Sequence, residues 1–372
     1  MQSPPTLITR SSHLKNSSLF SSKSYESYEL VDTLPSLLIG FPRMKRLNAI
    51  TDLPGIRVGH ASDFKALTGC TVILFDQGAT GGVDIRGTAA GTRQLDALTH
   101  LHLVEKIHAI LLAGGSAFGL DAAGGVMAYL EERGKGFDVV KTKIPIVPAA
   151  VILDFGIGDF RMRPDHKMGY EACLNASKRV EEGSVGAGTG ATVGKLFGIE
   201  RAMKGGLGTS SIRGSNGLIV GAIVVVNAFG DVIHPSSNRI LVGARKSKES
   251  FQLANSSKWM KQGVTRKRLG AADPSAFNTT LGVIATNANL SKKEVHQVAQ
   301  IAHSGLAKVI SPLHTTFDGD LVFAVSVGKK KADVNTVGLL GEATLMDSVK
   351  RAVMKADGFG VIPAYKDIPG PQ

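Results

Sequence analysis

Two short stretches in the last third of the chain combine residue types that could carry hydrolytic chemistry. Asn278 and Thr279 stand where a polar loop is predicted to enter a buried strand over 280–285. A threonine hydroxyl can act as a nucleophile when a nearby base takes its proton. Further along, Asp318 and Asp320 flank a glycine before another predicted strand, and two close carboxylates can share a proton. Each stretch alone is ordinary, because Asp-Gly-Asp is typical of a turn.

The glycine-rich stretch Gly186–Leu196 invites a nucleotide-binding interpretation, which its spacing argues against. A phosphate-binding loop needs glycine, four residues, Gly-Lys, and then serine or threonine. Here Thr189 stands where the first glycine is required, and Leu196 stands where the magnesium-binding hydroxyl should be. The sequence therefore predicts no ATP or GTP site at this position.

Two further glycine-rich stretches also lack a complete motif. A nucleophile elbow needs glycine two residues after its serine, but Phe118 follows Ser116 at that distance. Ser116 is therefore interpreted as a turn or helix-cap residue. The stretch 205–217 is predicted to form a hairpin or a loop.

The elements that must position these residues alternate along the chain from Ile50 onward. Apolar runs predict strands over 71–75, 108–112 and 218–226, and the last of these is apolar enough to be buried on both faces. Helical spacing over 117–133 predicts a helix that Gly134 ends. Because only 245–277 resembles a linker, the pattern favours a single α/β or α+β unit.

Composition and charge exclude several classes of function. The chain has 372 residues, 43% of them hydrophobic, and a net charge of +12. The segment 245–268 supplies +7 of that charge and contains few aromatic residues, so we interpret it as an exposed loop rather than a phosphate-binding surface. No apolar run approaches the roughly 20 residues of a membrane span. We expect neither nucleic acid nor membrane as a partner.

The two cysteines, Cys70 and Cys173, are too few for a disulfide framework or a four-cysteine zinc site. We therefore expect a reducing compartment, and no cofactor or metal is predicted. Residues 1–25 contain eight serines, three basic residues and no acidic residue, which is the composition of a transit peptide. We predict that residues 1–43 are a mostly disordered extension and that the protein is cytoplasmic, with an organellar location as the alternative.

Six blocks in a fixed order make these features more specific, because together they resemble a known family. From about Ile50 to Pro363, the chain resembles the self-processing N-terminal-nucleophile aminopeptidases. These include L-aminopeptidase/D-amino-acid esterases, β-peptidyl aminopeptidases and nylon-oligomer hydrolases, and the Asn-Thr-Thr and Asp-Gly-Asp blocks are most similar to the last group. The blocks are TDLPGIRVGH, LAGGSAFGLDAAGGV, GAGTGATVGK, VVVNAFGDV, NTTLGVIATNA and HTTFDGDLVFAV.

The resemblance implies a fold, a cleavage site and a set of active-site residues. The fold is an α+β, four-layer αββα sandwich, similar to that of ornithine acetyltransferases. The precursor would cut itself between Asn278 and Thr279, which divides one catalytic domain into an α-subunit, 44–278, and a β-subunit, 279–372. The processed units would form homo-oligomers and act on small peptides or amides. The implied catalytic residues are Thr279, Asn227, Lys195, Asp318 and Asp320.

The implied chemistry is physically consistent. A free α-amine has a pKa of about 7.7 to 8.0, so that of Thr279 could take the proton of its own hydroxyl. Asn227 could donate to the oxyanion, and Lys195 could favour the neutral amine and stabilise anionic intermediates. Asp318 and Asp320 could orient the α-amines of Thr279 and of the substrate.

One position departs from the family pattern, and two alternative functions stay open. Leu153 stands where members of the family often carry a tyrosine, so the preferred substrate is open among L-peptides, D-amino-acid amides, β-peptides and ω-amino-acid oligomers. The alternatives are an acyltransferase of the ornithine acetyltransferase type and an inactive scaffold with the same fold.

Overall fold

The computed structural model describes residues 46–265 and 278–369. Residues Arg46–Gln372 form one compact unit. The predicted extension 1–43 lies outside the described residues. Both cysteines are buried and free. Within the described ranges, no helix is long and apolar enough to cross a membrane.

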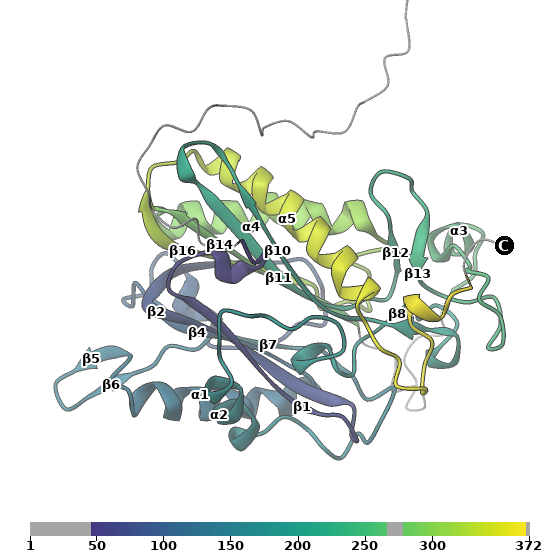
Figure 1. The fold of residues 1–372 in the computed structure, drawn as a ribbon, viewed down its shortest axis with the longest axis horizontal. Coiled ribbons are helices and arrows are strands. Elements are labelled where there is room, and N and C mark those ends of the chain that lie inside the picture. Colours follow the sequence, from purple (N-terminus) through teal and green to yellow (C-terminus); the bar gives the residue numbers. More distant parts are fainter. Residues whose placement is uncertain (1–45, 266–277, 370–372) are drawn as a thin grey trace, which may run out of the picture. The chain divides into compact units, whose positions relative to one another are not determined.

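Nine strands joined by hydrogen bonds form the centre of the fold (Figure 1). Their order is β10-β11-β14-β16-β2-β4-β7-β3, and β1 pairs with β2. The long strand β2 connects two halves, because its first part pairs with β1 and β4 and its last part with β16. The strands are β1 Ile56–Asp63, β2 Thr68–Ile85, β3 Gly91–Arg93, β4 Ile107–Ala113, β7 Ala149–Val151, β10 Gly206–Arg213, β11 Ile219–Asn227, β14 Thr279–Ala288 and β16 Leu321–Lys330.

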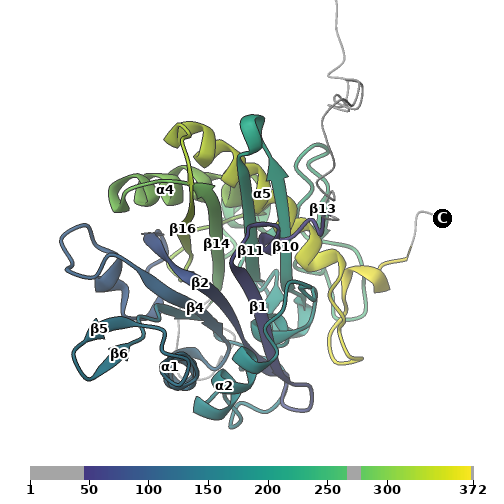
Figure 2. The ribbon, with the colours of Figure 1, turned by 60° about the vertical axis from the view of Figure 1, so that its left-hand side comes forward.

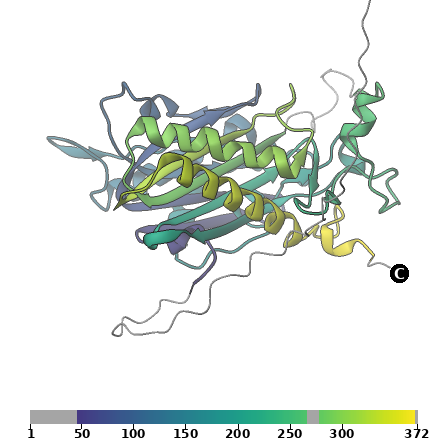
Figure 3. The same ribbon diagram turned by 90° about the horizontal axis from the view of Figure 1, so that it is seen from above.

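Helices cover the outer face of each half of the sheet (Figures 1 and 2). Viewed from above, α4 and α5 lie side by side across the strands (Figure 3). Three apolar clusters separate the layers: one between α4/α5 and the β10–β16 half, one between the two halves, and one between the β1–β4 half and α1/α2. The structure is thus an α+β sandwich with helices outside and strands inside. The helices are α1 Ala122–Glu131, α2 His166–Leu174, α3 Ser256–Lys261, α4 Lys292–Val309 and α5 Val334–Met354.

Local sequence signals explain where the helices α4 and α5 begin. Ser291 caps α4 and Glu294 completes a capping box, so two exposed N–H groups at this end are satisfied. Asp333 caps α5 by accepting the N–H of Thr336. All nine residues of β11 are buried, which confirms the predicted strand with two covered faces.

Three small sheets complete the described structure. One three-stranded sheet has the order β13-β12-β15, and it lies beyond the end of β11 in the chain. The other two are the pairs β5-β6 and β8-β9. The strands are β5 Phe137–Val139, β6 Thr142–Ile144, β8 Thr192–Val193, β9 Met203–Lys204, β12 Asp231–Ile233, β13 Ile240–Val242 and β15 Ile310–Ser311.

The helix predicted over 117–133 is shorter than its apolar spacing indicates. The α-helix begins at Ala122, and Ser116–Asp121 form a 3₁₀ helix before it. A Cβ on Gly119 would lie 1.9 Å from the carbonyl oxygen of Gly114, so the chain turns more tightly here than an α-helix does. The stretch 205–217, predicted as a hairpin or loop, contains β10, which pairs with β11 in a hairpin.

The basic segment 245–265 is exposed at its lysines, as its charge predicts, but it is fixed to the fold at a few buried positions. Ala254 and Ser256 are buried, and Ala254 joins an apolar cluster with Leu196 and Phe229. The carboxylate of Asp231 holds the segment by accepting the N–H of Ser256 at 2.7 Å and its hydroxyl at 2.8 Å. Between the exposed lysines, which agree with the predicted exposure, a few small and apolar residues face inward. Residues 266–277 lie outside the described residues.

Candidate active site

The predicted site residues meet where three neighbouring strands begin or end. Thr279 is the first residue of β14, and it lies opposite Asn227, the last residue of β11. On the other side, Asn278 forms a parallel bridge with Asp318, just before β16. The antiparallel pairing on one side and the parallel pairing on the other therefore bring the end of β11 and the approach to β16 to the same edge.

The peptide bond between Asn278 and Thr279 lies among hydrogen-bond donors. The Thr279 hydroxyl donates to the carbonyl oxygen of Asn278 at 2.6 Å. The N–H of Gly319 donates to the same oxygen at 2.7 Å. Asn278 is fully buried, and its own N–H donates to the carbonyl of Phe317 at 2.8 Å. Two donors thus converge on one carbonyl, and one of them is the hydroxyl of the next residue.

Glycine is required between the two aspartates. A Cβ at Gly319 would lie 2.6 Å from the carbonyl oxygen of Ala89 and 2.9 Å from the Thr279 hydroxyl oxygen. Both separations are shorter than real side chains tolerate, so a larger residue would displace the Thr279 hydroxyl or the backbone. The Asp-Gly-Asp sequence therefore allows close approach to the nucleophile candidate, in addition to the turn that it indicates by itself.

Asp320 is fully buried and holds the beginning of β14. Its Oδ1 accepts the N–H of Thr280 at 2.7 Å, one residue beyond the candidate nucleophile. Its Oδ2 accepts from the N–H of His314 at 3.1 Å and lies 3.0 Å from Nδ1 of the same residue. The Asp320 carboxylate thus connects β14 to the loop that precedes β16.

Asp318 is fully buried as well, but only neutral groups donate to it among the described residues. Its Oδ2 accepts the N–H and the hydroxyl of Thr315 at 2.9 and 2.6 Å, and its Oδ1 accepts the N–H of Phe229 at 3.3 Å. Burial and the neighbouring Asp320 carboxylate raise the pKa of Asp318 to about 7. Near neutral pH, this group can therefore either accept or donate a proton.

Lys195 and Asn227 form the side of the site next to β11. The Lys195 ammonium, which is 2% exposed, donates to the side-chain oxygen of Asn227 at 2.8 Å and to its carbonyl oxygen at 3.0 Å. The preceding Gly194 has a φ of +72°, which favours glycine and turns the chain so that the lysine points inward. The cation and the amide therefore form one connected group beside Thr279.

Leu153 contacts this group through its backbone rather than its side chain. The Nδ2 of Asn227 donates to the carbonyl oxygen of Leu153 at 3.1 Å, and this is its one acceptor among the described residues. An amide NH₂ has two hydrogens, so the second can serve another acceptor. Any residue at position 153 can supply the carbonyl, so the difference from tyrosine affects only the side chain.

Four groups that contact the site were missed by reasoning from residue types. They are the N–H of Gly319, the N–H of Phe229, and the side chains of His314 and Thr315. The last two belong to the same HTTFDGD block as the aspartates, and that proximity is a signal that could have identified them. The backbone donors carry no side-chain signal at all.

Within the described residues, no group of three or more histidine, cysteine, aspartate or glutamate side chains is arranged to hold a metal ion. The arrangement described above can carry acyl chemistry. It contains the Thr279 hydroxyl, two donors to the Asn278 carbonyl oxygen and the buried Lys195 ammonium. It also contains two buried carboxylates whose hydrogen-bond donors differ.

Comparisons with known proteins agree with this arrangement. The fold is similar to that of the L-aminopeptidase D-Ala-esterase/amidase from Ochrobactrum anthropi, which is described as a variant of the Ntn-hydrolase fold. That match has a TM-score of 0.62 and 18% identity, and it covers 84% of this chain and 87% of the other. This likeness shows the fold, an α+β sandwich like that of the Ntn-hydrolase variant.

The sequence comparisons identify the family. Residues 48–362 match Peptidase family S58, and the chain belongs to that family. An uncharacterized aminopeptidase of Mycobacterium leprae is 39% identical over 350 residues, which cover 86% of this chain and 93% of the relative. A 6-aminohexanoate-oligomer endohydrolase of a Kocuria species is 31% identical over 318 residues, which cover 81% of this chain and 84% of the relative. The chain is therefore an aminopeptidase-type amide hydrolase, and the predicted resemblance is confirmed.

Proposed function

We propose that this chain cuts its own backbone between Asn278 and Thr279 and then uses Thr279 as an N-terminal nucleophile on short peptides or amides. The observation that supports this most directly is the geometry at the Asn278 carbonyl. The Thr279 hydroxyl and the Gly319 N–H both donate to its oxygen, at 2.6 and 2.7 Å. The proposed nucleophile therefore lies against the carbonyl group that it would attack.

Self-cleavage would proceed through an ester. The Thr279 hydroxyl oxygen attacks the Asn278 carbonyl carbon, and the Gly319 N–H stabilises the oxyanion that forms. The bond from that carbon to the Thr279 nitrogen breaks, and the nitrogen takes up the proton that the hydroxyl loses. Water then hydrolyses the ester, which leaves a carboxylate on Asn278 and a free α-amine on Thr279.

The free α-amine would supply the base for substrate hydrolysis. It takes the proton of the Thr279 hydroxyl, whose oxygen attacks the carbonyl carbon of the substrate amide, and it passes that proton to the leaving amine. Water then hydrolyses the ester on Thr279, which releases the carboxylic acid and restores the hydroxyl. The second N–H of the Asn227 side chain can donate to the developing oxyanion, and the buried Lys195 ammonium favours the neutral form of the α-amine. Asp318 and Asp320, beside the same backbone, would orient the α-amines.

The substrate class follows from the relatives. Their names describe aminopeptidases, which act at an amino end, and a 6-aminohexanoate-oligomer endohydrolase. We therefore propose short amides with an unblocked amino end as substrates, acted on by homo-oligomers of processed units. Hydrolysis of alanine p-nitroanilide, of a β-alanine dipeptide and of 6-aminohexanoate oligomers by the same preparation would rank the three substrates.

Intact mass and N-terminal sequencing of purified protein test the cleavage directly. We expect two chains that stay associated, the second beginning at Thr279. Thr279→Ala removes the hydroxyl and should give one uncut, inactive, folded chain, whereas Thr279→Ser should still be processed. A new N-terminus elsewhere, or normal cleavage of the alanine variant, would contradict the proposal.

A further inference from the structure

His314 holds Asp320 in an unusual way. Its φ of +56° is a left-handed conformation that non-glycine residues seldom adopt. In that conformation, its backbone N–H and its ring Nδ1 both reach Oδ2 of Asp320, at 3.1 and 3.0 Å. A strained backbone that directs two groups of one residue to one oxygen is the kind of feature that persists at functional sites.

The hydrogen bond defines which ring nitrogen carries the proton. An ionised carboxylate only accepts, so Nδ1 of His314 must be the donor when Asp320 is ionised. The other nitrogen, Nε2, is buried and has no hydrogen-bond partner among the described residues. The ring therefore has one contact of hydrogen-bonding type, and that contact is with Asp320.

A second histidine, His303, packs against the ring of His314. The ring of His303 meets that of His314 edge to face, with centroids 4.8 Å apart. His303 is fully buried, and its Nδ1 lies 2.8 Å from Asp84, which Arg86 also contacts. Burial, together with the neighbouring His314, lowers the pKa of His303. Among the described residues, two ionisable groups contact the His314 ring, namely Asp320 and His303. Behind His303 lie Asp84 and Arg86.

The two aspartates of the site are distinguished by this contact. Asp320 receives the imidazole donor and the N–H of Thr280, whereas Asp318 receives hydroxyl and backbone donors. Two buried carboxylates side by side do not both ionise readily. The one with the better donors keeps its charge, and its neighbour takes the proton.

We propose that His314 is a positioning residue that keeps Asp320 ionised and directed at the Thr280 N–H, so that the exchangeable proton of the carboxylate pair resides on Asp318. This inference rests on the proposed function, because the step that it affects is cleavage at Thr279. His314 touches neither the peptide bond nor a substrate, and it acts through Asp320.

Two substitutions separate the donor from the ring. His314→Asn keeps an N–H donor near the position of Nδ1 and suits a left-handed backbone, but it loses the ring. His314→Phe keeps a ring against His303 but loses the donor. A hydrogen bond to a charged group contributes about 1.5 to 3 kcal/mol. We therefore expect the phenylalanine variant to cleave itself about 10- to 100-fold more slowly than wild type. The asparagine variant, which keeps a donor, should stay within about fivefold of wild type.

The pH profile of self-cleavage gives a readout that packing alone would not move. Without the imidazole donor, the ionised form of Asp320 is less stable relative to its protonated form. The acidic limb of the profile should therefore move to higher pH in the phenylalanine variant and stay near its wild-type position in the asparagine variant. His60→Phe is the matched control, because His60 is partly buried like His314, contacts a hydroxyl through Nδ1 and has a buried Nε2 without a hydrogen-bond partner among the described residues.

The outcomes separate the positioning role of His314 from the proposed self-cleavage at Thr279. Faster cleavage by the phenylalanine variant than by the asparagine variant, or an unshifted acidic limb, would overturn the positioning role. If the phenylalanine variant does not fold, His314→Leu replaces it, with the same expected loss. If wild-type protein never yields a chain beginning at Thr279, the proposed function and this inference are both overturned. If wild type and all variants cleave equally, only the inference is overturned.

Discussion

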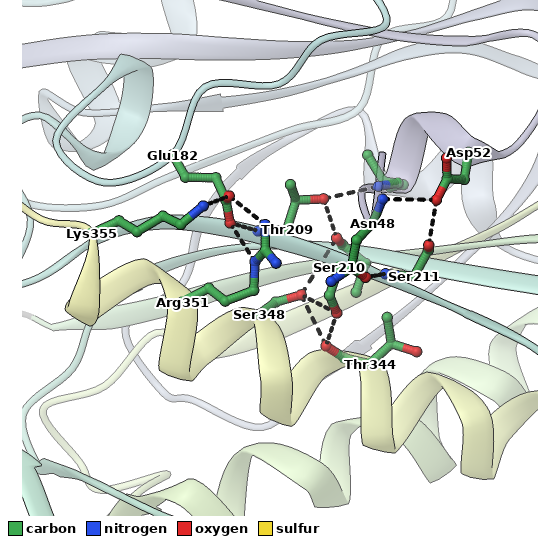
Figure 4. A network of polar contacts seen from close by, with 12 residues as sticks. Asn48, Asp52, Glu182, Thr209, Ser210, Ser211, Thr344, Ser348, Arg351 and Lys355 are labelled. Carbon is green, nitrogen blue, oxygen red and sulfur yellow. Dashed lines mark hydrogen bonds and ion pairs between the residues drawn. The ribbon is translucent and has the colours of Figure 1, made fainter. Parts of the chain in front are cut away.

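Two buried carboxylate clusters in this molecule are built in opposite ways. Glu182 lies against β10 and α5, where Arg351 and Lys355 both contact its carboxylate and the N–H of Thr209 donates to it at 3.0 Å (Figure 4). Asp318 lies beside another carboxylate, and neutral groups supply its donors. One carboxylate is neutralised by two cations, while the other faces a like charge.

The pKa values of the two groups move in opposite directions as a result. Burial alone would raise the pKa of Glu182, but Arg351 and Lys355 outweigh it, and the net shift is downward. Burial and the neighbouring Asp320 both raise the pKa of Asp318, to about 7. We infer from this difference that the cations stabilise the Glu182 region, whereas the raised pKa of Asp318 fits the carboxylate pair of an active site.

The aspartate pair gives the largest expected effect among the tests of this comparison. Asp318→Asn and Asp320→Asn remove the exchangeable proton or the charge while keeping the side-chain shape. Each should slow self-cleavage about 100-fold, which corresponds to roughly 2.7 kcal/mol, with little loss of thermal stability. Cleavage time courses by electrophoresis, with melting curves of the same samples, would measure both. If the variants lose thermal stability but cleave themselves at the wild-type rate, the aspartate pair has a structural role like that of the Glu182 cluster.

The reverse result is expected at Glu182. Glu182→Gln removes the charge that Arg351 and Lys355 contact, and the Lys355 side chain is about half exposed at 49%. Solvent screening reduces that contribution, so we expect a loss of about 1 to 2 kcal/mol in unfolding free energy. Urea unfolding of the variant in a Thr279→Ala background would measure it. Self-cleavage of the single Glu182→Gln variant should match wild type, and a slower rate there would break the comparison.

The sign of the pH dependence of stability should also differ between the clusters. In the unfolded chain, aspartate titrates near 3.9 and glutamate near 4.3. Because the folded-state pKa of Asp318 is raised, its contribution falls as the pH rises from about 4 to about 7, and Asp318→Asn should flatten that decline. Because the pKa of Glu182 is lowered, its contribution is present above about 4.3 and is lost as the pH falls below that value. Unfolding curves from about pH 2 to about pH 8 on uncut Thr279→Ala protein would show whether the slopes oppose each other.

The smallest effect is expected at Leu153, which contacts the site but belongs to neither cluster. Its carbonyl accepts from Asn227 whatever side chain it carries, so Leu153→Tyr should preserve cleavage. A phenol there adds a donor near the substrate, and we expect changes below about tenfold in kcat/KM, or roughly 1.4 kcal/mol, with different ratios among α-, β- and ω-amino amides. Loss of self-cleavage in this variant would mean that the side chain, and not only the backbone, supports Asn227.

Much of this arrangement could be predicted from the sequence, for reasons that particular residues show. The apolar run that forms β11 reads directly as a buried strand, and the ordered blocks identify the family. The shared site of Asn278, Thr279 and the two aspartates followed from the resemblance, because strand pairing between distant segments leaves no signal in either segment alone. The acyltransferase-like fold comparison and the homo-oligomer stay predictions.

The features that could not be predicted from the sequence depend on tertiary structure. The Gly319 N–H can donate to the Asn278 carbonyl oxygen only because β14 and the approach to β16 run side by side. The basic segment 245–265 reads as solvent-exposed because its few inward residues, such as Ala254, are small and scattered. The polar cluster around Ser210 and Ser348 is likewise invisible in sequence, since its partners are 138 positions apart.

The place of β14 in the sheet has a consequence for the lifetime of the protein. Residues 279–369 contribute β14 and β16 to the middle of the nine-stranded sheet, and α4 and α5 to one outer layer. After the proposed cut, neither fragment could complete its apolar core alone, so the parts would separate only by unfolding. Refolding would then be a bimolecular search that depends on concentration, whereas the precursor folds as a single chain. The fold would therefore be assembled once, and its survival afterwards would be governed by the height of the unfolding barrier.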